Sequence, residues 1–573
     1  MNGLIMLVIS LIVLAAAYLF YGRYLARTWG IDPARKTPAC EFEDGEEYVP
    51  SSPAVLFGHQ FASIAGAGPI NGPIIAAMFG WLPVLLWLLL GAVFFGAAHD
   101  FIALYTSVKN KGRSIGYVIE LYVGKAGKRL FLIFVWLFSI LIIAAFADIV
   151  AGTFSGFSGG LPKRTNAQVA SASTLFIAAA LALGFLIRKK KASDLASGVI
   201  AVDLLIACIT LGIFFPIFLS GPVWLYLVFA YIGIASVAPV WLLGQPRDYL
   251  SSFLLIAMVI AASLGVLFTA PAISIPAFTG FEVEGNYLFP TLFITIACGA
   301  ISGFHSMVAA GAASRQINNE KYMLPISYGA MLVETLVAVL ALIAVGSLAE
   351  GGRLPEGTPP VIFAGAVSGF LHRLGLPIQV SFTIVSLAIS SFVLTTLDTV
   401  ARLGRLSFQE LFPSEVKAEA EADLGSGVKK KPPVFAKILS GKAASTIITL
   451  GPAYFLAVTG YEKIWALFGA ANQLLAALTL IACLLFLKKT KRRGFMLLIP
   501  TVIMLAITFS SLLLGIRAKL VLLKNGSFSA AADALQLAVA VLLLLLGIMV
   551  LIFCLRKLWK RNPDSESLER DAA

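Results

Sequence analysis

Charge and paired cysteines are scarce in this sequence. Only 13% of its 573 residues are charged, against roughly a quarter in soluble domains, while 59% are apolar. The five cysteines show no CxxC or other paired spacing, so neither a disulfide framework nor a metal site is expected. The absence of HExxH and paired-aspartate motifs argues against an enzyme, in particular an intramembrane hydrolase. A soluble globule could not hide this much apolar surface, whereas a lipid bilayer can.

The apolar residues form long runs along the whole chain. Because a helix crosses the hydrocarbon core with about 20 apolar residues, these runs predict an all-α polytopic membrane protein. We expect about 15 transmembrane helices. The predicted spans are residues 3–21, 54–80, 82–108, 130–150, 169–187, 195–219, 223–243, 249–270, 288–312, 322–348, 377–397, 443–459, 464–487, 495–515 and 533–555.

The basic residues predict the orientation of the chain. The formal net charge is +13, which alone could suggest binding to nucleic acid. With the N-terminus placed outside, however, only eight of the 43 lysines and arginines fall on the outer side. Positive residues gather in cytoplasmic loops, so we predict a multi-pass protein of the cell membrane with its N-terminus outside and its C-terminus cytoplasmic. The outer residues are Lys163, Arg164, Arg353, Arg373, Lys463, Arg517, Lys519 and Lys524.

Polar stretches divide the chain. Residues 1–397 are predicted to form a transmembrane region that contains two broken helices. The Lys-, Glu- and Pro-rich composition within residues 398–442 predicts a cytoplasmic linker. Residues 443–560 are expected to add further transmembrane helices, and residues 561–573 a polar tail.

Two predicted spans are not expected to form continuous helices. Proline removes a backbone donor and clashes with the preceding turn, and backbone freed inside a bilayer must be buried in protein or line a cavity. Span 288–312 carries glycines and serines at mid-depth, and span 464–487 shows a weaker signal of the same kind. A kink, or close packing through small residues, is the alternative. The residues that interrupt span 54–80 are Gly66, Gly68, Pro69, Gly72 and Pro73.

The two broken segments run in opposite directions in the predicted topology. Paired interrupted helices of this kind indicate an inverted-repeat transporter with its site at the breaks, with chance similarity of Gly-rich helices as the alternative. His59 and His305 each lie near a break, and histidine titrates near neutrality, which suits proton coupling. The predicted substrate-binding residues are His59, Gln60, Ser63, Gly66, Gly68, Asn71, Gly303, His305 and Ser306.

Polar side chains at membrane depth are candidates for ion coupling. An acidic residue in a span costs about 2.5–3.5 kcal/mol on insertion scales, so Asp100 and Glu334 need a reason for being there. Ser391 and Thr395 share one helix face and are candidate ligands of an ion. Hydrogen bonds from these hydroxyls to their own helix are the alternative. The coupling ion, H⁺ or Na⁺, stays open, and no other cofactor is expected.

Several long blocks resemble a known family. The segments FGHQFASIAGAGPINGPIIAAMFG, CGAISGFHSMVAAGAASRQINNE, TTLDTVARLGRLSFQEL and IWALFGAANQLLAAL are similar to the carbon starvation protein A family, over about residues 57–478. The resemblance implies uptake of peptides and pyruvate across the bacterial inner membrane under nutrient limitation, within the amino acid–polyamine–organocation transporters. Gln60 stands where the family pattern has a second histidine.

The resemblance also implies a leucine-transporter-like core of five plus five inverted helices. The second to sixth predicted spans would form one repeat and the ninth to thirteenth the other, with the seventh and eighth inserted as a pair. We therefore expect an ion-coupled importer of small carboxylate-bearing nutrients, with a channel or a membrane-embedded nutrient sensor as the alternative. Its expected partners are the solute and the bilayer, with the oligomeric state open. Leucine at Gly68 is expected to fill the substrate cavity rather than disturb packing.

Overall fold

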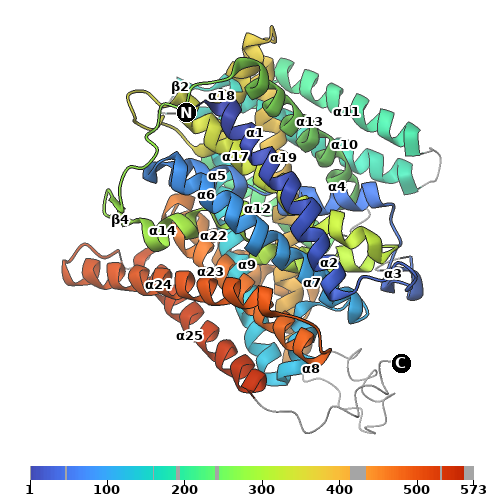
Figure 1. Cartoon of the computed structure of the whole chain (residues 1–573). Helices are drawn as coiled ribbons and strands as arrows, with labels where there is room; N and C mark the ends of the chain where they lie inside the picture. The colour runs from blue at the N-terminus through green and yellow to red at the C-terminus, as the bar shows by residue number, and fades with distance from the viewer. Residues whose placement is uncertain are drawn as a thin grey trace.

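The computed structural model is an assembly of packed helices (Figure 1). It describes residues 2–45, 48–158, 161–188, 194–238, 244–412, 434–529 and 532–559. The strands within these ranges form two short antiparallel hairpins, Phe157–Ser158 (β1) with Leu161–Pro162 (β2) and Glu282–Val283 (β3) with Asn286–Tyr287 (β4). The predicted all-α class is confirmed.

Helices form because a bilayer leaves the backbone no partner but itself. In the first half of the chain they are α1 (Gly3–Ala16), η1 (Ala17–Gly22), α2 (Arg23–Trp29), α3 (Pro38–Glu41), α4 (Pro53–Ile64), α5 (Gly68–Ala76), η2 (Ala77–Phe79), α6 (Trp81–Gly91), η3 (Ala92–Gly96), α7 (Ala97–Lys109), α8 (Ile115–Val123), α9 (Lys125–Phe154), α10 (Arg164–Arg188), α11 (Asp194–Phe214), α12 (Gly221–Val237) and α13 (Gly244–Thr269). In the second half they are α14 (Leu288–Thr295), α15 (Ala297–Ala300), α16 (Gly303–Gly311), η4 (Ala313–Arg315), η5 (Glu320–Tyr322), η6 (Leu324–Gly329), α17 (Ala330–Leu348), α18 (Pro359–Arg373), α19 (Ile378–Gln409), α21 (Val434–Leu439), α22 (Lys442–Ala457), α23 (Tyr461–Lys489), α24 (Phe495–Lys524) and α25 (Ala532–Trp559).

The number of membrane spans is smaller by length and composition than the sequence predicts. Among the described residues, 10 helices are long and apolar enough to cross a membrane, or up to 11 with the bent pair of α4 and α5. Helices occupy all the other predicted spans, but α12, α22 and the apolar stretch Gly198–Phe214 of α11 are short, and residues 288–312 are divided into three helices. About 15 spans therefore stays a prediction.

The helix α18 (Pro359–Arg373) lies outside every predicted span, as do the shorter α3, α8 and α21. The helix α18 begins at the prolines Pro359 and Pro360, which fit a first turn because their missing N–H groups have no helical partner there. It has 15 residues, fewer than a membrane span needs, so no apolar run of that length indicates it in the sequence. It packs against α17 and α19 at the end of the molecule where α1 begins (Figure 1).

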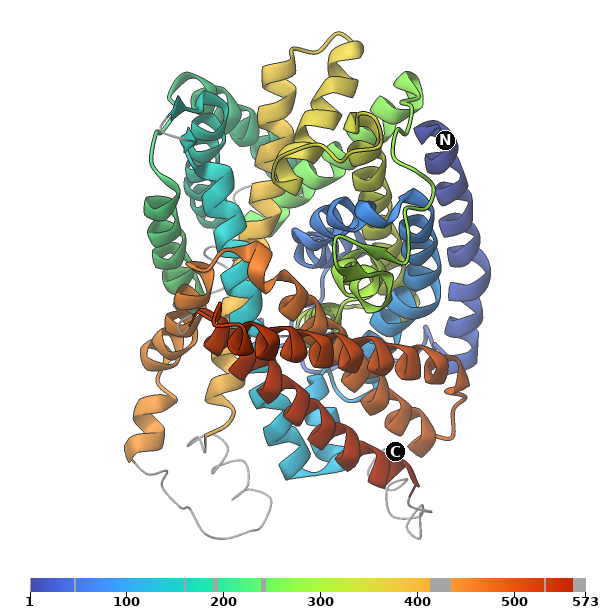
Figure 2. The ribbon, with the colours of Figure 1, turned by 90° about the vertical axis from the view of Figure 1, so that its left-hand side faces the viewer.

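The two long helices α9 and α19 pack along each other in the middle of the molecule (Figure 2). The helices α12 and α22 each pack against both of them, and α13 packs against α4 and α19. The helix α24 runs across the others rather than along them in Figure 2, and α25 packs against it. The broken helices thus lie beside a scaffold of continuous ones.

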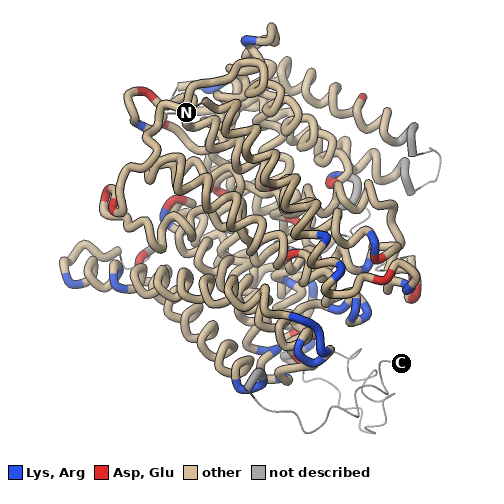
Figure 3. Tube along the Cα trace, viewed as in Figure 1, with Lys and Arg blue, Asp and Glu red and all other residues tan. Residues whose placement is uncertain are grey.

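Positive charge is unevenly distributed over the molecule. Lys and Arg gather in the lower half of the view in Figure 3, whereas the start of α1 lies in the upper half. This separation agrees with the basic asymmetry of the sequence, but it does not say which side of the membrane each half faces. The orientation of the termini stays a prediction.

One predicted boundary and one predicted interruption are wrong. The helix α19 continues to Gln409, into the predicted linker, because Val400, Ala401 and Phe408 extend its buried face. The helix α23 is continuous, so the third interruption, within residues 464–487, does not exist. The predicted linker segment 413–433 and the polar tail lie outside the described residues.

Candidate functional site

The first predicted break is present. The helix α4 ends at Ile64, α5 begins at Gly68, and the two axes are bent by 44°. A methyl group at Gly72 would lie 2.7 Å from the carbonyl oxygen of Thr295, and one at Gly68 would clash with the side chain of Cys298. These glycines let α5 approach α14 and α15 closely. Gly68 therefore lies in a packing interface, which corrects the expectation that leucine there would fill a cavity.

The second predicted break is also present, and α23 stabilises it. The helix α15 ends at Ala300, and Ile301 and Ser302 are extended before α16 begins at Gly303. The side-chain oxygen of Asn472 accepts hydrogen bonds from the hydroxyl of Ser302 and the backbone N–H of Phe304, both at 3.1 Å. Asn472 thus caps the N-terminus of α16 from a neighbouring helix.

The same face of α23 holds the first half of this broken helix. The indole N–H of Trp465 donates to the carbonyl of Thr295 at 3.4 Å, and the amide of Gln473 donates to that of Phe293 at 2.5 Å. A methyl group at Gly469 would lie 2.5 Å from the carbonyl oxygen of Ile294. The small and polar residues of α23 that suggested a third interruption therefore contact the broken helix of the second interruption.

A buried charged cluster joins α7, α16 and α17. Nδ1 of His305 lies 2.9 Å from Oδ2 of Asp100, and its Nε2 lies 3.2 Å from Oε2 of Glu334. Nδ1 of His99 lies 2.9 Å from Oδ1 of Asp100, and all four side chains are fully buried. Two histidines and two carboxylates thus share one fully buried site, whose net charge depends on the number of protons that they hold. The structure brings together three residues that the sequence singled out separately.

This cluster reaches the first break. The helix α16, which carries His305, packs against α4, which ends at Ile64. Among the described residues, neither oxygen of Glu334 accepts a hydrogen bond, although both are buried. Glu334 therefore has an ionic partner in His305 but no hydrogen-bond donor within the described part of the chain.

Three polar side chains that flank the first break also lack partners in the protein. Gln60 and Ser63 on α4 and Asn71 on α5 are fully buried, yet none of their side-chain polar atoms makes a hydrogen bond within the described part of the chain. Buried polar groups in native proteins nearly always have partners. Their role in substrate binding stays a prediction, and their buried polar atoms are free to bind a polar ligand.

Three other predicted residues face neighbouring helices instead. The hydroxyl of Ser306 donates to the carbonyl of Gly303 at 2.7 Å and lies 3.1 Å from that of Thr479. A methyl group at Gly303 would lie 2.5 Å from backbone and side-chain atoms of α23, and one at Gly66 would lie 2.8 Å from the ring of Phe146. Ser306, Gly303 and Gly66 thus pack against α23 or α9.

The two histidines do not occupy equivalent places. His59 lies before the first break, whereas His305 lies after the second. Nδ1 of His59 is 3.0 Å from Oδ2 of Asp248 on α13, and its side chain is 19% exposed, unlike that of His305. A glycine closely precedes each histidine, in Gly58-His59 and Gly303-Phe304-His305, but the two histidines therefore do not occupy equivalent positions.

The predicted ion ligands Ser391 and Thr395 lie next to a buried arginine that the sequence analysis placed in a loop. Nε of Arg247 donates to Oγ1 of Thr395 at 3.3 Å, and Arg247 forms an ion pair with Asp398. Ser251 lies 2.8 Å from the hydroxyl of Ser391. A charged residue at the end of an apolar run normally indicates the end of a membrane span. The acidic Asp398 at the end of another span was the only signal in the sequence that could have indicated a buried partner for Arg247.

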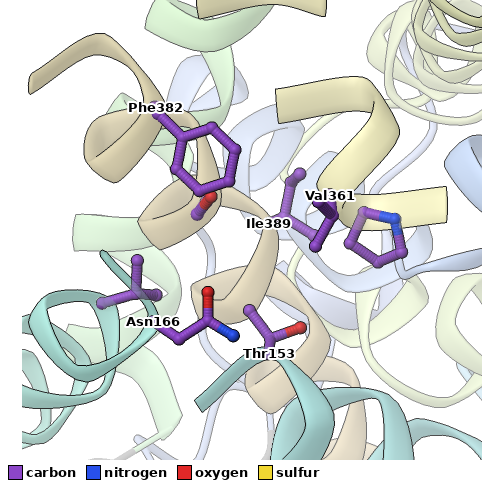
Figure 4. A pocket seen from close by; sticks show the side chains of 8 residues that line it. Thr153, Asn166, Val361, Phe382 and Ile389 are labelled. Atoms are coloured by element: carbon purple, nitrogen blue, oxygen red, sulfur yellow. The ribbon is translucent and has the colours of Figure 1, made fainter. Parts of the chain in front are cut away.

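A separate small pocket lies away from both breaks, near the ends of α9, α10, α18 and α19. Thr153, Asn166, Val361, Phe382 and Ile389 line it (Figure 4). Its volume of about 10 Å³ is roughly the space that one water molecule needs. It is therefore too small to be the substrate site.

Comparison with known proteins gives a consistent picture. A profile of the family described as Carbon starvation protein CstA matches residues 2–355 and 353–511. The peptide transporters CstA of Escherichia coli (strain K12) and Bacillus subtilis (strain 168) are both 32% identical, over 89% and 87% of this chain and 80% and 88% of their own. The pyruvate/proton symporter BtsT of Escherichia coli is 37% identical over 65% of this chain and 53% of its own. Among solved structures, a manganese transporter of Eremococcus coleocola has a TM-score of 0.49 and 11% identity over 89% of this chain and 97% of its own.

Proposed function

The chain belongs to the carbon starvation protein CstA family, and on that premise we propose that it imports small carboxylate-bearing nutrients, peptides or pyruvate, together with protons. The names of its relatives support this solute class. The observation that carries the proposal is the buried Asp100–His305–Glu334 cluster beside a break with unpartnered polar side chains. Synthesis under carbon starvation, in a bacterial inner membrane, belongs to the same proposal and rests on the family.

The geometry favours the first break as the place of the substrate carboxylate. The N-terminus of α5 has no side-chain cap, so the N–H of Gly68 and the positive end of the helix dipole are available to an anion, whereas Pro69 has no N–H and those of Ile70 and Asn71 donate to the carbonyl of Ala67. The N-terminus of α16 is capped by Asn472 and is not available in this way. Ser63 and Asn71 can donate hydrogen bonds to the same ligand.

The charged cluster favours a proton as the coupling ion. His305 faces Asp100 and His99 from α7 and Glu334 from α17, while α23 contributes only hydroxyl and amide groups there. Proton uptake at Glu334 would neutralise its carboxylate, which is buried and accepts no hydrogen bond from the described residues. Since α16 packs against α4, we expect the change in charge to influence the first break, where we propose that the substrate binds.

A carrier explains the closed site better than its alternatives do. A channel needs a continuous polar path, whereas Gln60, Ser63, Asn71 and Glu334 are fully buried. A nutrient sensor would need a binding site but no proton site. Alternating access requires a state in which the substrate is closed off from both sides, and these residues have that environment.

We also propose a core of two five-helix repeats, with a different assignment from that of the sequence. The first repeat is α4–α5, α6–α7, α9, α12 and α13, and the second is α14–α16, α17, α19, α22 and α23. In support, helices at corresponding places in the two repeats make corresponding contacts. The last helix of the first repeat, α13, packs against α4 and α19, and the last helix of the second, α23, packs against α16 and α9. Likewise, α5 packs against α17, and α16 packs against α7. The inserted pair is then α10 and α11, not the seventh and eighth predicted spans.

Transport into proteoliposomes tests the proposed function. We expect a pH gradient, alkaline inside, to drive accumulation of labelled pyruvate or dipeptide by the unmodified protein. Glu334→Gln cannot exchange a proton, so it should lose accumulation and keep counterflow exchange. Glu282→Gln, the same change at an exposed position, is the control. Accumulation by Glu334→Gln at the unmodified rate would contradict proton coupling through this residue.

Cysteine labelling tests the proposed orientation. Of the five cysteines only Cys40 is exposed, and it lies on the proposed cytoplasmic side. An impermeant maleimide added to intact cells should therefore leave the unmodified protein unlabelled and label Glu282→Cys on the outer side. Labelling of the unmodified protein from outside would reverse the topology.

A further inference from the structure

A positive charge is buried near the start of α13. The side chain of Arg247 is 1% exposed. A guanidinium remains protonated in proteins, so this charge is permanent. It therefore differs from the histidine cluster, whose charge can change during a transport cycle.

Residues of α12 and α19 bind this guanidinium. Its Nη1 donates to the carboxylate of Asp398 and to the hydroxyl of Tyr231, and its Nε donates to Oγ1 of Thr395 at 3.3 Å. The hydroxyl of Tyr231 also donates to Oδ2 of Asp398 at 2.8 Å. Arg247 is thus held by oxygen atoms, as a bound cation would be.

The same oxygen atoms form a set that a metal cation could use. The hydroxyl of Ser251 lies 2.8 Å from that of Ser391 and 3.3 Å from that of Thr395, and Asp398 adds a carboxylate. Carboxylate and hydroxyl oxygens are the ligands that hard cations such as Na⁺ prefer. The sequence proposed Ser391 and Thr395 as ion ligands for this reason, and the structure fills their surroundings with Arg247.

Other charged groups nearby have their own partners. Nη2 of Arg402 donates to the carbonyl of Ala235 at 3.0 Å, and Asp248 pairs with His59. Arg247 is therefore the cation in contact with Thr395 among the described residues.

We infer that Arg247 is a built-in cation that occupies a sodium-type site between α13 and α19, so that transport requires no sodium. Two positive charges a few Å apart in a buried site repel strongly, and Na⁺ cannot enter while the guanidinium is there. Removal of the guanidinium would leave Asp398 as a buried unpaired anion, which a cation of the right size would stabilise. The inference deepens the proposed function and rests on it only for the transport measurement.

Thermal unfolding of purified full-length variants tests the site without any transport assay. Unfolding is followed in NaCl and in choline chloride at equal ionic strength. The unmodified protein should have the same Tm in both. In choline chloride, Arg247→Ala should have a lower Tm than the unmodified protein. Its Tm should rise with the NaCl concentration, because an ion that binds only the folded state stabilises it by mass action.

Two further variants control this measurement. Arg247→Lys keeps a positive charge and should not respond to sodium. The double variant Arg247→Ala with Asp398→Asn lacks both charges, so it should also lose the response. A sodium response in the double variant, or none in a folded Arg247→Ala, would overturn the inference.

The unmodified protein provides a test if Arg247→Ala does not fold. Counterflow of labelled substrate should proceed at the same rate in sodium and in choline. Exchange or Tm that depends on sodium would overturn the inference. Failure of proton-driven accumulation would contradict the proposed function instead, and the Tm measurements would still be read independently.

Discussion

The two helix breaks differ in how their surroundings treat the backbone and side chains around them. At the second break, Asn472 caps α16, and Trp465 and Gln473 bind carbonyl groups of α14. At the first break, no side chain caps α5, and Ser63 and Asn71 have no partner among the described residues. Similar interruptions in the sequence therefore have different structural roles.

This difference indicates how binding and scaffolding are divided. Polar groups that the protein satisfies by itself contribute to stability, whereas buried groups without partners are available to a ligand. The second break therefore belongs mainly to the framework, with His305 as the residue that we propose for proton coupling. Variants at matched positions of the two breaks can show whether the division holds.

The largest effect is expected at Gly68. Leucine at this position clashes with Cys298, and overpacking costs about 1–3 kcal/mol or more. We expect Gly68→Leu to give little folded protein by size-exclusion chromatography. Gly515→Leu, on α24 where nothing lies within 4 Å, should behave normally. Folded but inactive Gly68→Leu would instead return this glycine to the binding cavity.

Asn472→Ala should have the next largest effect, on stability. Its loss leaves the backbone N–H of Phe304 and the hydroxyl of Ser302 buried without their acceptor, at a cost of about 1–3 kcal/mol. The Tm of the purified protein should fall clearly. An unchanged Tm would mean that the second break does not depend on α23.

Asn71→Ala should affect transport rather than stability. Asn71 makes no hydrogen bond within the protein, so its Tm should stay close to that of the unmodified protein. A lost hydrogen bond to a charged ligand, worth about 1.5–3 kcal/mol, should raise KM for substrate about ten- to a hundredfold. Asn525→Ala, at an exposed helix end, is the control. A fall in Tm with unchanged KM would assign Asn71 to the framework.

The smallest effects are expected from a pair of serines. Ser306→Ala loses a hydrogen bond to Thr479 and should cost about 1 kcal/mol of stability without changing uptake. Ser63→Ala loses no bond within the protein and should change KM but not Tm. The opposite pattern would exchange the roles assigned to the two breaks.

Much of this comparison could be predicted from local sequence. Pro69 and Pro73 indicated the first break, and the rarity of charge in spans singled out Asp100 and Glu334. The sequence could also place all the long helices, because apolar runs determine them directly. These signals lie within one segment each and need no knowledge of its neighbours.

What could not be predicted depends on contacts between distant segments. Gly68 packs against Cys298, and Arg247 pairs with Asp398, and neither partner lies near in sequence. The stretch around Asn472 suggested an interrupted helix, although α23 is continuous. Small and polar residues occur both where a helix is interrupted and where a continuous helix packs against an interrupted one, so composition does not distinguish the two cases. His59 suggested equivalence with His305 for a similarly local reason.

The attachment of the second break to α23 has a mechanical consequence. A broken helix whose two halves are both fastened to one continuous helix behaves as part of a single rod, so α14 and α16 cannot tilt independently of α23. The helices α4 and α5 both pack against α17, but no side chain caps the start of α5, so we predict that the bend between them acts as the hinge. Pulsed electron spin distances should therefore stay fixed between labels on α16 and α23 when substrate is added, while those between α4 and α23 change. A change in the first distance would show that the second break also acts as a hinge.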